Sequence, residues 1–228
     1  MSVSGRGAGY NDADAVGFVL AGGQSSRMGQ NKALVEFAGR PLVAHALAIF
    51  AQAGLTARIA GAAWQARASL EAFAPVIEDA TPGLGPLSGI CAALGATTAR
   101  YAVFLSVDLP LLPPSLLVYL LHQARITERA VTVSMVSGFA QTFPAVIDRE
   151  VLPALLNELN AGRLGCYSAF EAASKAMGEP TGSVAVELLA QSGRVTDKHG
   201  RPPVHWFLNL NSPADLARAA GICSGRIA

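Results

Sequence analysis

The sequence has few charges and no marked excess of either sign. Only 14% of its 228 residues are charged, and 17 Lys and Arg against 16 Asp and Glu give a formal net charge of +1. Without surplus cations the chain cannot coat a phosphate backbone, which excludes a dedicated nucleic-acid binder. With 51% hydrophobic residues it is too apolar to be disordered. A chain of this length buries a sizeable core, and we expect one large domain.

Cysteine is scarce as well. Cys91, Cys166 and Cys223 are odd in number and far apart, and the sequence has neither a C-x-x-C pair nor a zinc-type Cys/His spacing. This argues against a zinc site and favours three reduced, buried thiols. The 4 histidines are scattered, with no pair at i, i+4, and we expect them to be structural.

Long apolar runs are absent where a membrane span or a signal peptide would need them. The stretch that most resembles a membrane span, Tyr101–Leu121, contains a carboxylate and three prolines, which a spanning helix of about 20 apolar residues does not accommodate. The first residues, MSVSGRGAGYNDAD, contain no apolar run. We expect a cytoplasmic protein with no membrane partner, in which residues 1–14 form a flexible tail ahead of a single domain over residues 15–228.

Short apolar runs alternate with helical stretches along the rest of the chain. The expected strands are Val16–Leu20, Thr56–Ala60, Pro75–Ile77, Tyr101–Val107, Ala130–Val136, Thr142–Ile147 and Val204–Leu210. The expected helices are Pro41–Ala53, Pro86–Ala96, Pro114–Arg125, Glu150–Asn160, Gly165–Ala176 and a last one that Ser212 opens as its N-cap. This alternation predicts an α/β fold with βαβ units and a mostly parallel sheet covered on both faces.

The first expected strand leads directly into a glycine-rich loop, LAGGQSSRMGQNKAL. Gly22, Gly23 and Gly29 allow a ligand to approach the backbone closely, and Arg27 and Lys32 add two cations. A loop of this kind after a parallel strand favours phosphate binding, against the plain alternative of an ordinary strand-to-helix connection. The glycine spacing matches neither the ATPase P-loop nor the dinucleotide fingerprint.

A lone carboxylate, Asp108, ends the apolar strand Tyr101–Val107. A buried Asp needs a cation or several hydrogen bonds, and the carboxyl end of a central strand faces the same edge of the sheet as the glycine-rich loop. Mg²⁺ held beside phosphates is the interpretation we favour. The alternative is that Asp108 caps the segment that follows.

Two further segments carry candidate binding residues. Asp79 precedes a glycine-rich turn from Gly85 to Gly89 that opens a helix, and its carboxylate suits either a ribose or base contact or a plain loop. Asn209 and Asn211 share one side of the last expected strand. Their amides suit phosphates or metal-bound water, and equally a turn.

These segments together resemble a known family. LAGGQSSRMGQNKAL resembles the signature of nucleotidyltransferases related to molybdenum cofactor guanylyltransferase, the MobA-like group. VIEDATPGLGPLSGI, VDLPLLPP and FLNLNSPADL resemble the later motifs of that group, in the same order. The resemblance extends from Val16 to about Ala220 and is thinner between Ala130 and Pro203.

The resemblance implies a three-layer Rossmann-like nucleotidyltransferase fold with a mostly parallel central sheet. It implies an enzyme that uses Mg²⁺ to move GMP from GTP onto the phosphate of the molybdenum-molybdopterin cofactor. The products are the molybdopterin guanine dinucleotide cofactor and pyrophosphate. GTP and the molybdopterin cofactor are the implied partners, together with transient contacts to other molybdenum cofactor proteins.

The matching positions imply roles for individual residues. The implied catalytic residues are Arg27, Lys32 and Asp108, with Asp108 as the metal ligand. The implied nucleotide-binding residues are Leu20, Ala21, Gly22, Gly23, Lys32, Asp79, Gly85, Gly89 and Asp108. The implied acceptor-side residues are Asn209 and Asn211. No general base is expected, because a phosphate acceptor is already ionised.

One departure from the family pattern concerns recognition of the guanine base of the nucleotide. The family often has an Asn after the second strand, whereas the corresponding stretch Ile59–Trp64 has none. The alternative is therefore a related nucleotidyltransferase that uses CTP or another acceptor, such as cytidylyl transfer to a molybdopterin, or transfer to a sugar phosphate or cobinamide phosphate. The presence of both Lys32 and Asp108 argues against a binding protein that has lost catalysis.

Overall fold

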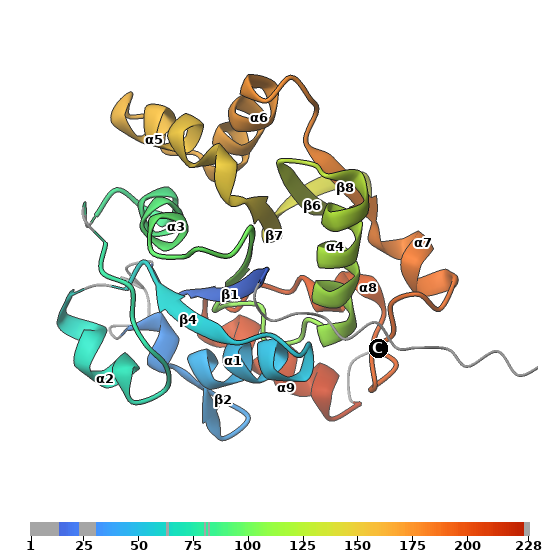
Figure 1. The fold of residues 1–228 in the computed structure, drawn as a ribbon. Coiled ribbons are helices and arrows are strands. Elements are labelled where there is room, and N and C mark those ends of the chain that lie inside the picture. Colours follow the sequence, from blue (N-terminus) through green and yellow to red (C-terminus); the bar gives the residue numbers. More distant parts are fainter. Residues whose placement is uncertain (1–13, 23–30, 63, 80, 82, 226–228) are drawn as a thin grey trace, which may run out of the picture.

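The central feature of the fold is a 6-stranded sheet with the order β4-β1-β5-β7-β6-β8 (Figure 1). The computed structural model describes residues 14–22, 31–62, 64–79, 81 and 83–225. The strands of the sheet are β1 (Ala15–Leu20), β4 (Ala57–Ala60), β5 (Tyr101–Ser106), β6 (Val131–Val136), β7 (Phe139–Asp148) and β8 (Gly182–Ala185). A separate small hairpin pairs β2 (Glu36–Phe37) with β3 (Arg40–Pro41).

Most neighbouring strands of this sheet run parallel. β1 pairs in parallel with β4 and β5, β6 pairs in parallel with β8, and β7 runs antiparallel to both of its neighbours. Leu20, at the end of β1, pairs with Ala60 and with Ser106, so β1, β4 and β5 end at one edge of the sheet. This edge is called the carboxyl edge below. The predicted α/β class with a mostly parallel sheet is confirmed.

Helices cover both faces of the sheet (Figure 1). One face carries α1 (Leu42–Gln52), α4 (Pro114–Thr127) and α9 (Pro213–Cys223), and the other carries α3 (Pro86–Gly95), α5 (Leu152–Asn160) and α6 (Cys166–Ala176). Shorter helices are α2 (Arg67–Glu71), α7 (Val186–Gln191), α8 (Pro203–Trp206) and the 3₁₀ turns η1 (Lys32–Leu34), η2 (Trp64–Ala66) and η3 (Arg149–Val151). In the part of the chain that the structure describes, no helix combines the length and the apolar character needed to cross a membrane.

The two helical layers explain why the first strand is apolar throughout. Phe18 packs into the core beneath α3, α5 and α6, whereas Val19 packs into the core beneath α1 and α4. Gly17 faces α1 so closely that a β-carbon there would lie 2.5 Å from the Phe50 ring. A strand buried on both faces has no solvent side, and its sequence shows no polar alternation.

One expected strand is wrong. Residues 203–206 form helix α8, and no described residue pairs with residues 207–210 as a strand. Pro202 and Pro203 open the helix, because proline suits its first turn and disrupts a sheet ladder. Pro75–Ile77 is reduced to a single parallel bridge between Val76 and Ile59.

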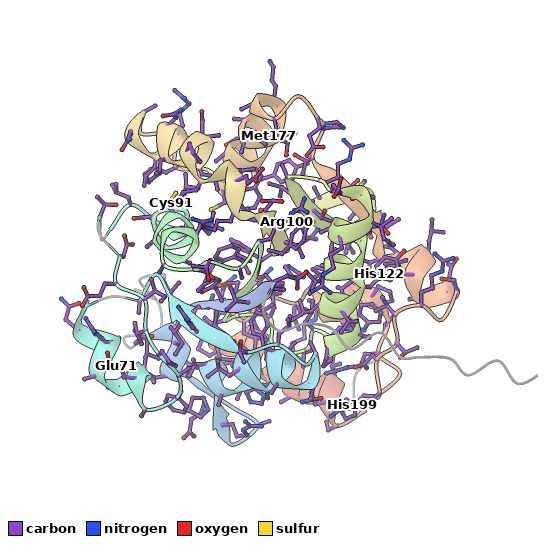
Figure 2. All side chains as sticks on the ribbon, viewed as in Figure 1. Glu71, Cys91, Arg100, His122, Met177 and His199 are labelled. Carbon is purple, nitrogen blue, oxygen red and sulfur yellow. The ribbon has the colours of Figure 1, made fainter. Side chains whose placement is uncertain are left out.

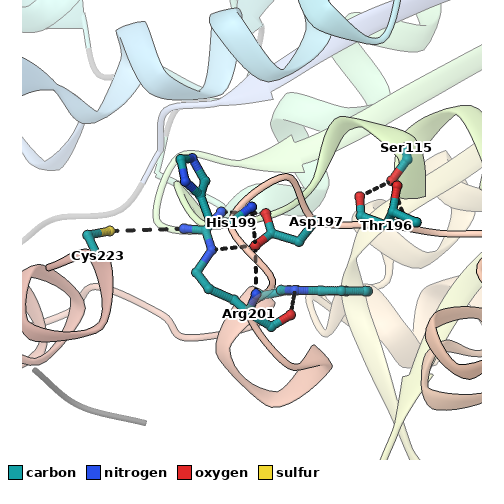
Figure 3. Close-up of polar contacts among 7 residues, drawn as sticks. Ser115, Thr196, Asp197, His199, Arg201 and Cys223 are labelled. Atoms are coloured by element: carbon teal, nitrogen blue, oxygen red, sulfur yellow. Dashed lines mark hydrogen bonds and ion pairs between the residues drawn. The ribbon is translucent and has the colours of Figure 1, made fainter. Parts of the chain in front are cut away.

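The loop that leads into α8 is tied down by side chains (Figure 3). Arg201 donates three hydrogen bonds to the Asp197 carboxylate, two from its guanidinium and one from its backbone N–H, and the Asp197 side chain is only 3% exposed. Burial alone would raise the pKa of the Asp197 carboxyl, but hydrogen bonds from Arg201 outweigh it and hold that pKa below its usual value. Ser115 on α4 bonds both backbone polar groups of Thr196, and the Trp206 indole donates to the Arg201 carbonyl. These contacts fix the approach of the chain to the carboxyl edge.

The three cysteines are free but not equally buried. Cys91 lies in the core on the side of the molecule that carries α5 and α6 (Figure 2), and burial raises its pKa to about 11. Cys166 is partly buried. Cys223 is exposed at the end of α9, 4.0 Å from an Arg201 nitrogen, so the expectation of a buried thiol is wrong there. The end of an amphipathic surface helix leaves this side chain in solvent.

Candidate active site

A lysine, an aspartate and an asparagine from three distant segments meet at the carboxyl edge. The Lys32 Nζ lies 2.7 Å from the Asp108 Oδ2 and also donates to the Asn211 Oδ1. The side chains of Lys32 and Asp108 are 11% and 14% exposed. An ion pair this sheltered from water holds its geometry far better than a surface pair.

Backbone hydrogen bonds hold Asp108 in place. The Val107 N–H donates to the Leu20 carbonyl, which extends the pairing of β5 with β1 beyond the last residue of the strand. The Leu210 N–H donates to the Asp108 carbonyl over 3.0 Å. Asp108 is therefore clamped between the end of β1 and the segment that precedes α9.

Caps at helix starts fix the other two members of this cluster. Asn31, the N-cap of η1, accepts a hydrogen bond from the Ala33 N–H and so sets the turn that begins with Lys32. Ser212 caps α9 by accepting from the Asp215 N–H, as the sequence predicts. The Asp215 carboxylate in turn accepts from the Asn211 N–H over 3.0 Å. Both segments reach the cluster through short, defined turns.

One carboxylate oxygen of Asp108 is a candidate ligand for a metal ion. Its Oδ1 is buried and has no hydrogen-bond partner among the described residues. Burying a carboxylate oxygen without a partner is costly, and such an orphan is typical of a binding site. Carboxylate oxygens are the ligands Mg²⁺ prefers, and it commonly takes one or two of them together with water and substrate phosphates. The described residues contain no cluster of three or more His, Cys, Asp or Glu. The chemistry of the Asp108 Oδ1 suits a site in which the protein contributes a single carboxylate.

Three glycines bring the start of α3 against the ends of β1 and β4. A β-carbon on Gly22 would lie 2.4 Å from the Gly61 carbonyl oxygen, and one on Gly89 would lie 2.7 Å from the Gly61 α-carbon. Gly61 itself has φ +68°, a conformation that favours glycine. The backbone can approach this closely only without side chains, and the result places Gly61 between Gly22 and the first turns of α3.

Replacing Gly89 with Ala should therefore destabilise the protein. An unstrained Gly-to-Ala change in a helix gains up to about 1 kcal/mol, but here the new methyl group meets backbone atoms that cannot rotate away, and overpacking costs about 1–3 kcal/mol. Gly95, in the same helix, is the matched control, because its β-carbon would meet only the Leu152 side chain at 4.0 Å. Thermal unfolding should show a lower Tm for G89A and an unchanged or higher Tm for G95A. Equal Tm values for the two variants would contradict the packing argument.

Asp79 is held at the same edge by a network on α3. The Ile77 N–H donates to the Ile59 carbonyl, so the chain runs alongside β4 and leaves the sheet at the carboxyl edge. The Asp79 Oδ1 accepts hydrogen bonds from the Thr81 N–H, at 3.0 Å, and from the Ser88 hydroxyl. Ser88 is 2% exposed. Neither Ser88 nor Thr81 is singled out by the sequence, where both look like ordinary turn residues.

The structure brings some of the candidate residues together and leaves others apart. Lys32, Asp108 and Asn211 are in contact. Asn209 is not part of that cluster, since its amide donates to the Phe207 carbonyl, although it is exposed, as Asn211 is. The remaining described candidates lie at the end of β1 or around the start of α3: Leu20, Ala21, Gly22, Asp79, Gly85 and Gly89. Gly23 and Arg27 lie outside the described residues.

Comparison with known proteins identifies the family. Residues 17–176 match the family model described as a MobA-like NTP transferase domain. The chain belongs to the MobA-like NTP transferase family. The resemblance found in the sequence is thus confirmed, and this MobA-like protein is a nucleotidyltransferase.

Individual relatives agree with the family. A molybdenum cofactor guanylyltransferase from Vibrio cholerae is 32% identical over 202 residues, which is 88% of each chain. One from Xanthomonas euvesicatoria is 42% identical, but over 44% of this chain and 50% of its own length. The crystal structure of a molybdopterin-guanine dinucleotide biosynthesis protein A from Archaeoglobus fulgidus superimposes with a TM-score of 0.74, at 23% identity over 92% of this MobA-like chain and 98% of its own. That likeness shows the shared fold.

Proposed function

We propose that this MobA-like protein transfers GMP from GTP to the phosphate of the molybdenum-molybdopterin cofactor. The products are pyrophosphate and the guanine dinucleotide form of the cofactor. The observation that carries the proposal is the largely buried contact of Lys32 with Asp108 at the carboxyl edge, where β1 ends and the glycine-rich sequence motif begins. The V. cholerae relative, which matches over most of both chains, supports the choice of nucleotide and acceptor.

The proposed reaction is a displacement at the α-phosphorus of GTP. An oxygen of the acceptor phosphate forms the new P–O bond, and the bond to the β-phosphate oxygen breaks. Pyrophosphate leaves with the electron pair of that bond. The chain supplies no proton acceptor in this scheme, because the attacking phosphate oxygen is already ionised, and catalysis consists of positioning and charge stabilisation.

The residues at the carboxyl edge have complementary tasks in this proposal. Lys32 neutralises negative charge on the phosphates as the leaving group departs, and its amine is held ready for this by the Asn211 amide. Arg27 is the proposed second cation. Asp108 would hold Mg²⁺ through its buried carboxylate, and the ion would supply charge neutralisation at the α-phosphate and pyrophosphate oxygens. Asp79 is the proposed contact to the nucleoside.

A ligand panel together with a transfer assay tests the proposal. With Mg²⁺, GTP at 100 times its Kd should stabilise the protein by about 2.7 kcal/mol, whereas ATP, CTP and UTP should shift the Tm less. GTP and the molybdopterin cofactor should then give pyrophosphate and the dinucleotide product in equal amounts. The stretch Ile59–Trp64, at the end of β4 and directly after it, includes no Asn, so the choice of nucleotide base is the part of the proposal that this panel tests most sharply. A Tm shift with CTP and none with GTP would contradict guanylyl transfer and favour a cytidylyltransferase.

A further inference from the structure

We propose that Ser88 is a positioning residue for the nucleotide, because its hydroxyl group fixes the Asp79 carboxylate so that one oxygen faces the ligand. The inference rests on the proposed function in one respect: Asp79 is taken as a nucleotide contact. Ser88 itself lies 2% exposed in the first turn of α3, so it acts through Asp79 rather than on the ligand directly.

The direction of each hydrogen bond follows from the donors present. The Ser88 hydroxyl lies within hydrogen-bond distance of the Asp79 Oδ1, the Thr81 carbonyl at 3.0 Å and the Thr81 hydroxyl at 2.7 Å. A hydroxyl has one proton, and the ionised carboxylate is the strongest acceptor among these groups. Ser88 therefore donates to Asp79, and the Thr81 hydroxyl donates to Ser88. The chain of bonds runs from Thr81 through Ser88 to the carboxylate.

This network occupies one oxygen of Asp79 and leaves the other available. The Oδ1 takes both Ser88 and the Thr81 N–H, whereas the Oδ2 takes no hydrogen bond from the described part of the chain. A carboxylate held through one oxygen cannot rotate freely, so the second oxygen points in a fixed direction. A fixed acceptor binds a ribose hydroxyl or a base N–H with less loss of side-chain entropy than a mobile one.

The position of α3 gives the network a rigid base. Gly89, next to Ser88, packs against the Gly61 backbone, so the start of the helix lies directly against the residues that follow β4. The charge of Asp79 lies close enough to α3 to raise the pKa of the Cys91 thiol, after burial as the larger cause. Asp79 is thus anchored to the helix on one side and to the edge of the sheet on the other.

A double-mutant cycle on GTP binding tests the inference. Calorimetry with GTP and Mg²⁺, without acceptor, compares the wild type with S88A, D79N and S88A/D79N. Loss of a hydrogen bond to a charged group should weaken GTP binding of S88A about tenfold. If Ser88 acts through Asp79, the double variant should bind GTP no more weakly than D79N alone. In turnover, S88A should raise the KM for GTP about tenfold and leave kcat within about twofold.

A matched control separates positioning from folding. Ser168 holds the same place in α6 that Ser88 holds in α3, two residues after the first helical residue and three after a glycine N-cap, and its hydroxyl bonds the Gly165 carbonyl. S168A should therefore leave GTP binding unchanged. The inference fails if S88A binds GTP as the wild type does while D79N binds weakly, or if the two losses multiply in the double variant. If D79N itself binds GTP normally, the assignment of Asp79 as a nucleotide contact fails, and the role of Ser88 fails with it, while transfer by the other residues stands.

Discussion

Replacing Asp108 with Asn is expected to reduce GMP transfer by about a thousandfold or more. Asparagine keeps the shape of the side chain but loses the negative charge that would hold Mg²⁺ beside the phosphates. Losing one preorganised electrostatic contact costs about 10²–10³ in turnover, and loss of the metal removes several kcal/mol of charge stabilisation in addition. Initial rates of pyrophosphate release, with GTP, Mg²⁺ and the molybdopterin cofactor, measure the effect.

Asp148 provides the matched control for this substitution. It is also a largely buried aspartate in an ion pair, with Arg100 at 2.9 Å, but it lies at the opposite edge of the sheet, where β7 pairs with the start of β5. D148N should lose stability, because the neutral amide cannot form the ion pair with Arg100, although its oxygen can still cap η3. It should keep normal turnover at temperatures well below its Tm. Near-normal turnover of D108N under the same conditions would remove Asp108 from the mechanism.

The stability of D108N separates a catalytic effect from a folding effect. The wild-type protein already buries the Asp108 Oδ1 without a partner among the described residues, so removing the charge relieves a desolvation cost. Lys32 keeps the Asn211 amide, and its long stem lets the amine reach water. We expect the free energy of unfolding of the ligand-free protein to change by less than about 1 kcal/mol. A residue kept for function is often nearly neutral for stability.

The contact between Lys32 and Asp108, at the centre of the candidate site, can be predicted from the sequence, because parallel strands end at one edge of the sheet. The apolar run through Phe18 has to be a strand buried on both faces, and so does the run that Asp108 ends. Parallel strands in one sheet end at the same edge, so the polar residues that follow them must lie close together. The contact between Lys32 and Asp108 follows from this geometry.

The parts that the sequence does not predict depend on tertiary partners. Residues 204–210 form a short, mostly apolar run like that of a buried strand. Such a run does not supply a neighbouring strand, and the prolines before it favour a helix. In the sequence, Ser88 looks like an ordinary residue of a glycine-rich turn. Its hydrogen bonds with Asp79 and Thr81 depend on tertiary contacts that the sequence does not show. Asn209 and Asn211 look equivalent in sequence, yet only Asn211 reaches Lys32.

Replacing Lys32 with Met is expected to have opposite effects on transfer and on metal binding. Transfer should fall by about 10²–10³, because the amine no longer neutralises charge on the phosphates. Binding of Mn²⁺ to the protein without nucleotide should become tighter, by about tenfold or more. In the wild type the amine already occupies the Asp108 Oδ2 at 2.7 Å. A divalent cation 4 Å from that amine meets repulsion of about 8 kcal/mol at an effective dielectric constant of 20, twice the value for two unit charges.

Electron paramagnetic resonance of free Mn²⁺ measures this competition directly, without any turnover. K32M should bind Mn²⁺ more tightly than the wild type, D108N should not bind it at this site, and K175M, a change at an exposed lysine of α6, should behave as the wild type. Equal Mn²⁺ affinity of K32M and the wild type would show that the ion and the amine do not compete. Where they compete, a nucleotide whose phosphates draw Lys32 away from Asp108 must strengthen metal binding. By thermodynamic linkage the metal then strengthens nucleotide binding by the same factor, so the ligand-free enzyme is protected from binding the metal alone.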